Sequence, residues 1–184
     1  MKKVERSELL DYQTYGERRE EIRARIMKLK EDRRIHLGNH LTFLFENADT
    51  IRYQIQEMMR AERIVKEDAI LHELSTYNEI LGDDGELGCC LLIEIDDPAE
   101  RKERLREWMG LPEHLFLRAA DGRTVRAAYD PRQVGDDRLS SVQYLKFAVG
   151  DGEPAALGCD LVGLEVEAEL TGPQRRALTR DLRG

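Results

Sequence analysis

Apolar residues recur at helical spacing in three segments of the first half of the chain. Residues 17–34 carry a narrow apolar seam flanked by alternating charges, which predicts a long, mostly solvated helix. Residues 49–64 and 66–81 show the same period, and Asn47 or Asp49 can cap the first of these two helices. Because the seam of the first helix buries little surface, we expect that helix to pack on the domain or on another chain. Its apolar residues are Ile22, Ile26 and Leu29.

The second half of the chain changes to the alternating period of β-strands. The pair Asp121-Gly122 predicts a tight hairpin turn between two of these strands. One helix, capped by Asp97 with Pro98 at its first position, interrupts them. Counting the short aromatic run that precedes the helix pair, we expect strands at residues 41–45, 87–95, 115–119, 124–129, 141–149 and 161–170.

These elements together predict an α+β fold. The long N-terminal helix and two further helices are expected to pack on a mostly antiparallel sheet of about five or six strands. Short linkers and a uniform composition favour a single domain over residues 1–184. Within it we expect a helical arm at 1–38, a strand with a helix pair at 39–82, and a mostly antiparallel sheet with one inserted helix at 83–184.

Charge is distributed unevenly along the 184 residues, whose net charge is -8. The first 66 residues carry 15 Lys and Arg against 12 Asp and Glu, whereas the rest carry 14 against 25. A mildly basic arm on an acidic chain argues against nucleic-acid binding, which needs a strong positive stripe. It is compatible with binding of the N-terminal helix to an acidic protein partner, or to a second copy in a homo-oligomer.

The hydropathy pattern argues for a cytoplasmic protein without a membrane segment. The mean hydropathy is -0.58, and no apolar run approaches the roughly 20 residues of a membrane helix. The first ten residues lack the apolar core of a signal peptide. The three cysteines, Cys89, Cys90 and Cys159, lack metal-type spacing, so we expect reduced, buried thiols.

Polar side chains are concentrated around the first helix of the pair. Glu62 is expected on the same stripe as the apolar residues of that helix, and burying a carboxylate is unfavourable unless it is paired. Two interpretations remain open: a structural network that holds helix to sheet, or a carboxylate site formed by Glu46, Glu57 and Glu62. The candidate residues of this network are Glu46, Asn47, Tyr53, Gln54, Glu57, Arg60, Glu62, Arg63 and Tyr77.

A metal site is the weaker hypothesis for the neighbouring histidines. His36 and His40 would share one face of a continuous helix, a spacing that suits a metal pair, with Glu46 as the candidate carboxylate. Gly38 between them argues against that helix. On the last predicted strand, the row Glu165, Glu167 and Glu169 is read as a solvated sheet face balanced by Arg126 or Lys146.

Several catalytic signatures are missing from the sequence. There is no Gly-rich phosphate loop and no Gly-x-Ser-x-Gly nucleophile turn. A di-iron helical bundle needs Glu-x-x-His repeats, and the residue three before His72 is Ala69. These absences leave the reaction class and any cofactor unassigned.

The series FEN…YQIQEM…ER…YN resembles that of a bacterial family of unknown function. The resemblance extends over nearly the full length and implies a setting of redox or iron stress, since members of that family are often encoded beside rubrerythrin-like and iron–sulfur proteins. The stretch after Asn78, EILGDDGELGCC, departs from the family pattern, in which proline in the turn and Ala-Thr in the strand are expected. The matching residues are Phe45, Glu46, Asn47, Tyr53, Gln54, Gln56, Glu57, Met58, Glu62, Arg63, Tyr77 and Asn78.

Three functions are therefore compared with the structure. The first is an accessory protein that binds a partner, or itself, through the N-terminal helix. The second is a metal- or redox-cofactor-binding protein that uses carboxylates and histidines of residues 36–73. The third is a small-molecule enzyme, which requires Glu57, Arg60, Arg63 and Tyr77 to converge on a cavity.

Overall fold

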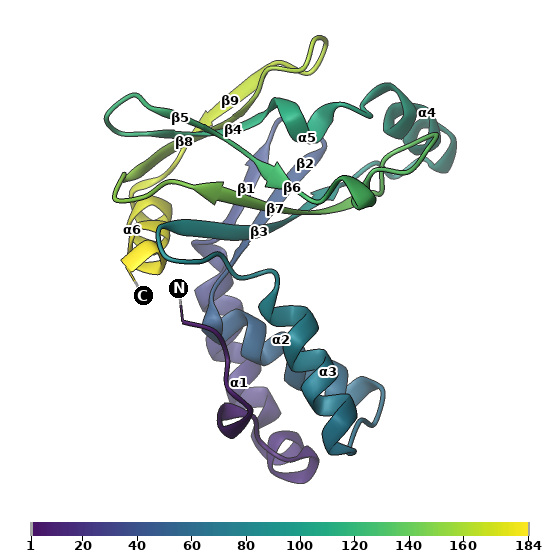
Figure 1. Cartoon of the computed structure of the whole chain (residues 1–184), viewed down its shortest axis with the longest axis vertical. Helices are drawn as coiled ribbons and strands as arrows, with labels where there is room; N and C mark the ends of the chain where they lie inside the picture. The colour runs from purple at the N-terminus through teal and green to yellow at the C-terminus, as the bar shows by residue number, and fades with distance from the viewer. Residues whose placement is uncertain (1, 184) are drawn as a thin grey trace.

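A computed structural model describes residues 2–183 and confirms the α+β class (Figure 1). Two antiparallel sheets stack on each other, and a group of three helices projects from one side of them. Among the described residues, no helix is long and apolar enough to cross a membrane. The helical elements are η1 (Arg6–Glu8), α1 (Tyr12–Glu31), α2 (Ala48–Ala61), α3 (Glu67–Asn78), α4 (Pro98–Glu107), α5 (Leu111–His114), η2 (Pro131–Gln133) and α6 (Gly172–Arg183).

The strands of residues 2–183 form one sheet in the order β1-β2-β3-β7-β6 and a second in the order β5-β4-β8-β9. The predicted strand at 124–129 is split between them. Its first part pairs with β4, whereas its last two residues pair with β7. The strands are β1 (Arg34–Leu37), β2 (Leu41–Glu46), β3 (Glu86–Ile93), β4 (Leu115–Ala119), β5 (Thr124–Arg126), β6 (Ala128–Tyr129), β7 (Val142–Ala148), β8 (Pro154–Cys159) and β9 (Val166–Glu169).

Two strands were not predicted from the sequence. Residues 34–37, expected within the helical arm, form β1 and pair with β2 across the turn at Gly38, where φ is 61°. The helix α1 ends at Glu31, earlier than expected, and Gly38 makes the turn between the two strands because a glycine readily takes this left-handed conformation. Residues 154–159 form β8, whose six residues are all buried and therefore show no alternation of apolar and polar positions.

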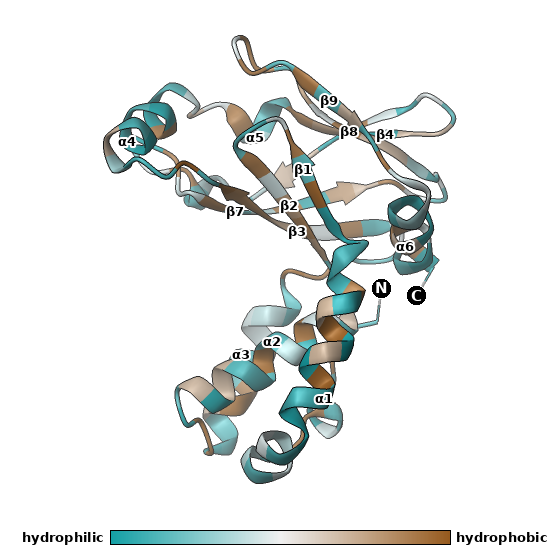
Figure 2. Cartoon of the chain, turned by 180° about the vertical axis from the view of Figure 1, so that it is seen from behind, coloured by the Kyte–Doolittle hydropathy of each residue, from teal (hydrophilic) through white to brown (hydrophobic). Residues whose placement is uncertain are grey.

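Apolar residues gather in two separate clusters. The larger lies between the sheets and includes residues of α4 and α6, and the smaller lies among α2, α3 and the N-terminal segment before α1. Figure 2 shows the same division, with brown positions facing inward and teal positions outward on the helices. Val65, in the turn after α2, is 70% exposed, and Leu71 on α3 is exposed as well.

Candidate functional site

Four of the nine candidate residues, Glu46, Asn47, Tyr53 and Glu57, lie along a polar seam that begins between α1 and α2. Glu57 is at its centre and accepts hydrogen bonds from Arg19 Nε at 2.8 Å, from Arg19 Nη2 at 2.7 Å and from the Tyr15 hydroxyl at 2.6 Å. The bond with Arg19 is the main reason why the pKa of Glu57 falls to about 2. Because each Glu57 oxygen accepts a hydrogen bond, this carboxylate acts as a link between the helices.

Tyr53, one turn before Glu57 on α2, and Glu46, at the end of β2, extend the seam. The buried Tyr53 hydroxyl accepts a hydrogen bond from Arg23 at 3.2 Å, and Lys30 Nζ lies 6.0 Å from the centre of the Tyr53 ring. The same Lys30 amine is 3.9 Å from Glu46 Oε1, beyond hydrogen-bonding distance. Burial raises the pKa of Glu46, and its Oε2 atom has no hydrogen-bond partner among the described residues.

A buried ion pair closes the seam at the sheet. Arg33 donates to Asp181 Oδ2 at 2.7 Å from Nε and to Oδ1 at 2.8 Å from Nη2. Asn47, which caps α2 by accepting from the Thr50 amide, also donates to Asp181 at 3.2 Å. Three elements far apart in sequence are therefore joined at one carboxylate.

Two further motif residues hold the N-terminal segment by their side-chain amides. Gln56 accepts from the Leu10 backbone N–H at 2.8 Å and donates to the Leu10 carbonyl at 3.0 Å. Asn78 makes the same pair of bonds to Val4, both at 2.9 Å. A side-chain amide has both a donor and an acceptor, as a backbone peptide does. Gln56 and Asn78 can therefore each bond both backbone groups of one residue in the N-terminal segment.

The other network candidates lie outside the seam. Glu62, expected on the buried stripe, is exposed at the C-terminal end of α2, and Arg60 and Arg63 are exposed as well. Gln54 is half-buried, and its side chain has no hydrogen bond among residues 2–183. Glu46 and Glu57 contact different cations of α1. Tyr77 lines a large cavity near the sheet, and Tyr53 lines a smaller one between α1 and α2.

The histidines take part in strand pairing. His36 Nδ1 lies 2.9 Å from the Thr42 hydroxyl, which donates to the Glu94 carboxylate. His40 Nδ1 is 3.3 Å from the Glu94 carbonyl, and the His40 ring packs beside Trp108. Throughout the described part of the chain, no three His, Cys, Asp or Glu side chains are grouped so as to hold a metal ion.

The acidic row on the last strand has a different partner from the one expected. Glu167 and Glu169 both accept from Arg118 on β4, the strand beyond β8, while Glu165 accepts from the Gly163 amide at 2.9 Å. Arg126 instead pairs with Asp160. Lys146, the other expected partner, belongs to the opposite sheet and lines a cleft.

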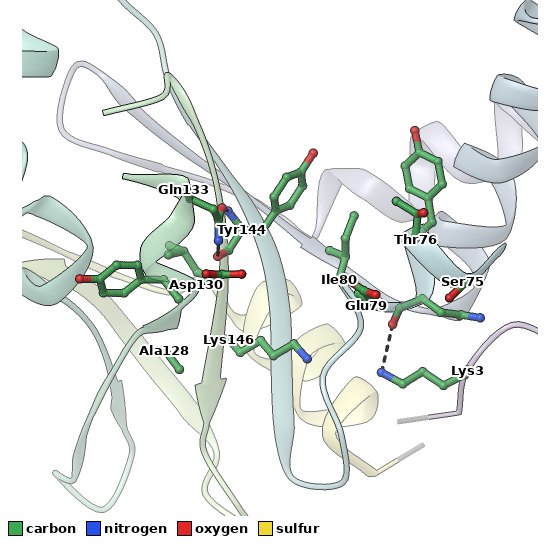
Figure 3. A pocket seen from close by; sticks show the side chains of 14 residues that line it. Lys3, Ser75, Thr76, Glu79, Ile80, Ala128, Asp130, Gln133, Tyr144 and Lys146 are labelled. Carbon is green, nitrogen blue, oxygen red and sulfur yellow. Dashed lines mark hydrogen bonds between the residues drawn. The ribbon is translucent and has the colours of Figure 1, made fainter. Parts of the chain in front are cut away.

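This cleft, about 970 Å³ in volume, opens between the C-terminal end of α3 and the outward face of β6 and β7 (Figure 3). Gly88 allows the helix end to approach the sheet. A Cβ atom at Gly88 would lie 1.9 Å from the carbonyl oxygen of Ile80, so the chain after α3 crosses β3 directly at this glycine. The crossing makes Ile80 one wall of the cleft, opposite Lys146 (Figure 3).

Tyr144 and its neighbours form the floor. Cys90 and Tyr144 are direct partners across β3 and β7, as are Gly88 and Lys146, so these side chains share the outward face of the sheet. Burial, the Cys90 thiol and the Tyr77 hydroxyl together raise the pKa of Tyr144. Burial raises the pKa of Cys90 to about 11, and its thiol is therefore protonated at neutral pH.

Most charged groups around the cleft are already paired. Lys3 donates to the carbonyls of Asn78 at 3.1 Å and Leu81 at 2.6 Å, which fixes the end of α3. Asp130 accepts from Arg132. The Lys146 side chain is half-buried. Within residues 2–183 its amine has neither an ion pair nor a hydrogen bond.

Sequence reasoning found only Tyr77 of the cleft residues. Tyr144 and Lys146 lie on an alternating strand, where their outward positions predict a solvated face. No local pattern shows that the end of α3, some 65 residues earlier, covers this face.

The chain is similar to other proteins of unknown function. The model of the family described as "Protein of unknown function (DUF3501)" matches residues 3–182. A crystal structure of a novel protein of unknown function from Burkholderia pseudomallei K96243 has a TM-score of 0.90 and 31% sequence identity, covering 98% of this chain and all of that one. The comparison with curated proteins found no match. The chain belongs to the DUF3501 family of proteins of unknown function.

Proposed function

We propose that the protein binds a small organic molecule in the cleft between α3 and β7. The observation that carries this proposal is the combination of a volume of about 970 Å³, tyrosines from three elements, and one half-buried lysine without a partner. Ligand sites in proteins are typically clefts of about 300–1,000 Å³ with aromatic walls and a few polar groups that fix orientation.

The polar seam supports this proposal as a scaffold. Its carboxylates are engaged by α1, and Asn78 and Lys3 hold the end of α3, whose Tyr77 reaches the cleft. Rigid elements position binding groups more accurately than free loops do. Because the Cys90 thiol is protonated at neutral pH, the proposal is for noncovalent binding rather than for attack by this thiol.

The test is a fragment library screened by NMR against the full chain. Fragments that bind should shift the amide signals of Thr76, Ala128 and Lys146. Tyr144→Ala should abolish these shifts, while Tyr12→Ala, which removes a tyrosine of nearly equal exposure from α1, should preserve them. Fragments that shift only the amides of α1 and α2, or that bind Tyr144→Ala unchanged, would refute the proposal.

Partner binding through the N-terminal helix stays a separate prediction. The exposed residues of α1 include Glu17, Glu21 and Lys28, and their charges support a salt-sensitive contact. A monomer in light scattering, together with capture of no partner by the intact chain, would refute it. The implied link to redox or iron stress and the cytoplasmic location likewise stay predictions.

A further inference from the structure

The charge of the cleft is set by Lys146. Among the cations that line it, Lys3 is bound to two carbonyls and lies 3.6 Å from Asp83. Of the two acids, Asp130 is paired with Arg132 and Glu79 is exposed at the rim. Water screens exposed charges more strongly than half-buried ones. An anionic ligand therefore gains more binding free energy by pairing with a half-buried ammonium that has no counter-ion than with an exposed charge.

Two of the tyrosines of the cleft come from elements on its two sides. Tyr144 is two residues before Lys146 on β7 and therefore lies on the same side of the sheet, while Tyr77 lines the cleft from α3. In the described chain neither hydroxyl has a hydrogen-bond partner, whereas the Tyr129 hydroxyl donates to Glu113 at 3.0 Å. Two tyrosines with unused hydroxyl donors therefore line the same cleft as one unpaired cation.

We infer that the ligand of this cleft is an aromatic anion, with its planar ring against Tyr144 and Tyr77 and its carboxylate-like group at Lys146. This inference rests on the proposed function and adds the chemical class of the ligand. Aromatic rings pair favourably with tyrosine faces, and a carboxylate accepts charge-assisted hydrogen bonds from lysine and from phenolic hydroxyls.

Three probes separate the parts of the inference: 2-naphthoate, 2-naphthamide and cyclohexanecarboxylate. Each is titrated into the full chain at neutral pH while the amide signals of Thr76 and Lys146 are followed by NMR. We expect 2-naphthoate to bind about tenfold more tightly than either of the others, the ratio that one charge-assisted hydrogen bond or one aromatic contact contributes. Lys146→Met, which keeps the apolar stem, should lower naphthoate affinity to that of the amide, whereas Lys28→Met on the exposed face of α1 should leave it unchanged.

The outcomes distinguish this inference from the function on which it rests. Equal affinity for 2-naphthoate and 2-naphthamide at the cleft would overturn the anionic class, and equal affinity for cyclohexanecarboxylate would overturn the aromatic class. Both results would leave the cleft as a binding site. If Lys146→Met does not fold, Lys146→Gln and the three-probe comparison on the unmodified chain still decide the matter. Naphthoate shifts confined to residues outside the cleft would overturn the inference, and the failure of every library fragment at the cleft would overturn the proposed function as well.

Discussion

Replacing Asp181 by asparagine should lower the free energy of unfolding by about 3 kcal/mol, at the lower end of the cost of breaking a buried ion pair. The Arg33 and Asp181 side chains are 4% and 6% exposed, and the carboxylate accepts three hydrogen bonds, two from Arg33 and one from Asn47. Asparagine keeps the shape but turns one acceptor into a donor and leaves the guanidinium buried without a counter-ion. For a chain of 184 residues this corresponds to a fall in Tm of about 6–12 °C.

Urea unfolding followed by Trp108 fluorescence and by far-UV circular dichroism measures this change. Trp108 is the single tryptophan and is buried in the sheet core, so its emission reports the sandwich, while the dichroism reports mainly the helices. Glu107→Gln, which removes an exposed pair with Arg104, is the control and should cost no more than about 0.5 kcal/mol. The apolar double variant Arg33→Met with Asp181→Leu should be more stable than Asp181→Asn alone. An Asp181→Asn variant as stable as the control would refute the reasoning.

Three further predictions concern the seam and the sheet crossing. Glu46→Gln should raise Tm at pH 7 but not below about pH 4. Burial raises the pKa of Glu46, so its charged form, which is present at higher pH, destabilises the folded state. A lower Tm of the variant at pH 7 would contradict this prediction. Glu57→Gln should reduce the fall in the free energy of unfolding between about pH 4.5 and 2. The lowered pKa of Glu57 stabilises the fold above that range, and this stabilisation is lost as the carboxylate is protonated. An unchanged fall in urea unfolding over the same pH range would contradict the role of Glu57 as a link between the helices. Gly88→Ala should cost at least about 2 kcal/mol in urea unfolding because its Cβ would meet the Ile80 carbonyl, whereas Gly16→Ala, in open space on α1, should stabilise by about 0.5–1 kcal/mol; equal effects would show that the crossing tolerates a side chain.

The periodicity of apolar residues was enough to predict the elements that have one buried and one exposed face. The helix pair and strand β7 each have one buried face, so their patterns indicated both type and approximate ends. It failed for β8, which is buried on both faces, and for β1, which lies between a helix and a glycine turn. The division of residues 124–129 between two sheets depends on partners that no local pattern reveals.

At the candidate site, too, local sequence patterns did not reveal which distant residues come into contact. Motif residues such as Glu57 and Gln56 were identified, but their partners Arg19 and Leu10 lie some 40 residues away, and the sequence left open whether the network is structural or functional. Lys146 was predicted to balance the acidic row on the last strand because that pairing was inferred from charge alone, but Lys146 belongs to the other sheet. Its place in the cleft follows from the Ile80 crossing over Gly88, which is a tertiary contact.

A crystal of the full chain soaked with 2-naphthoate tests most directly whether the cleft, rather than the seam, is the binding site. The account predicts density for the ring between Tyr77 and Tyr144, with the carboxylate at the amine of Lys146. Density only beside Glu46 or Glu57, with nothing bound between α3 and β7, would contradict it.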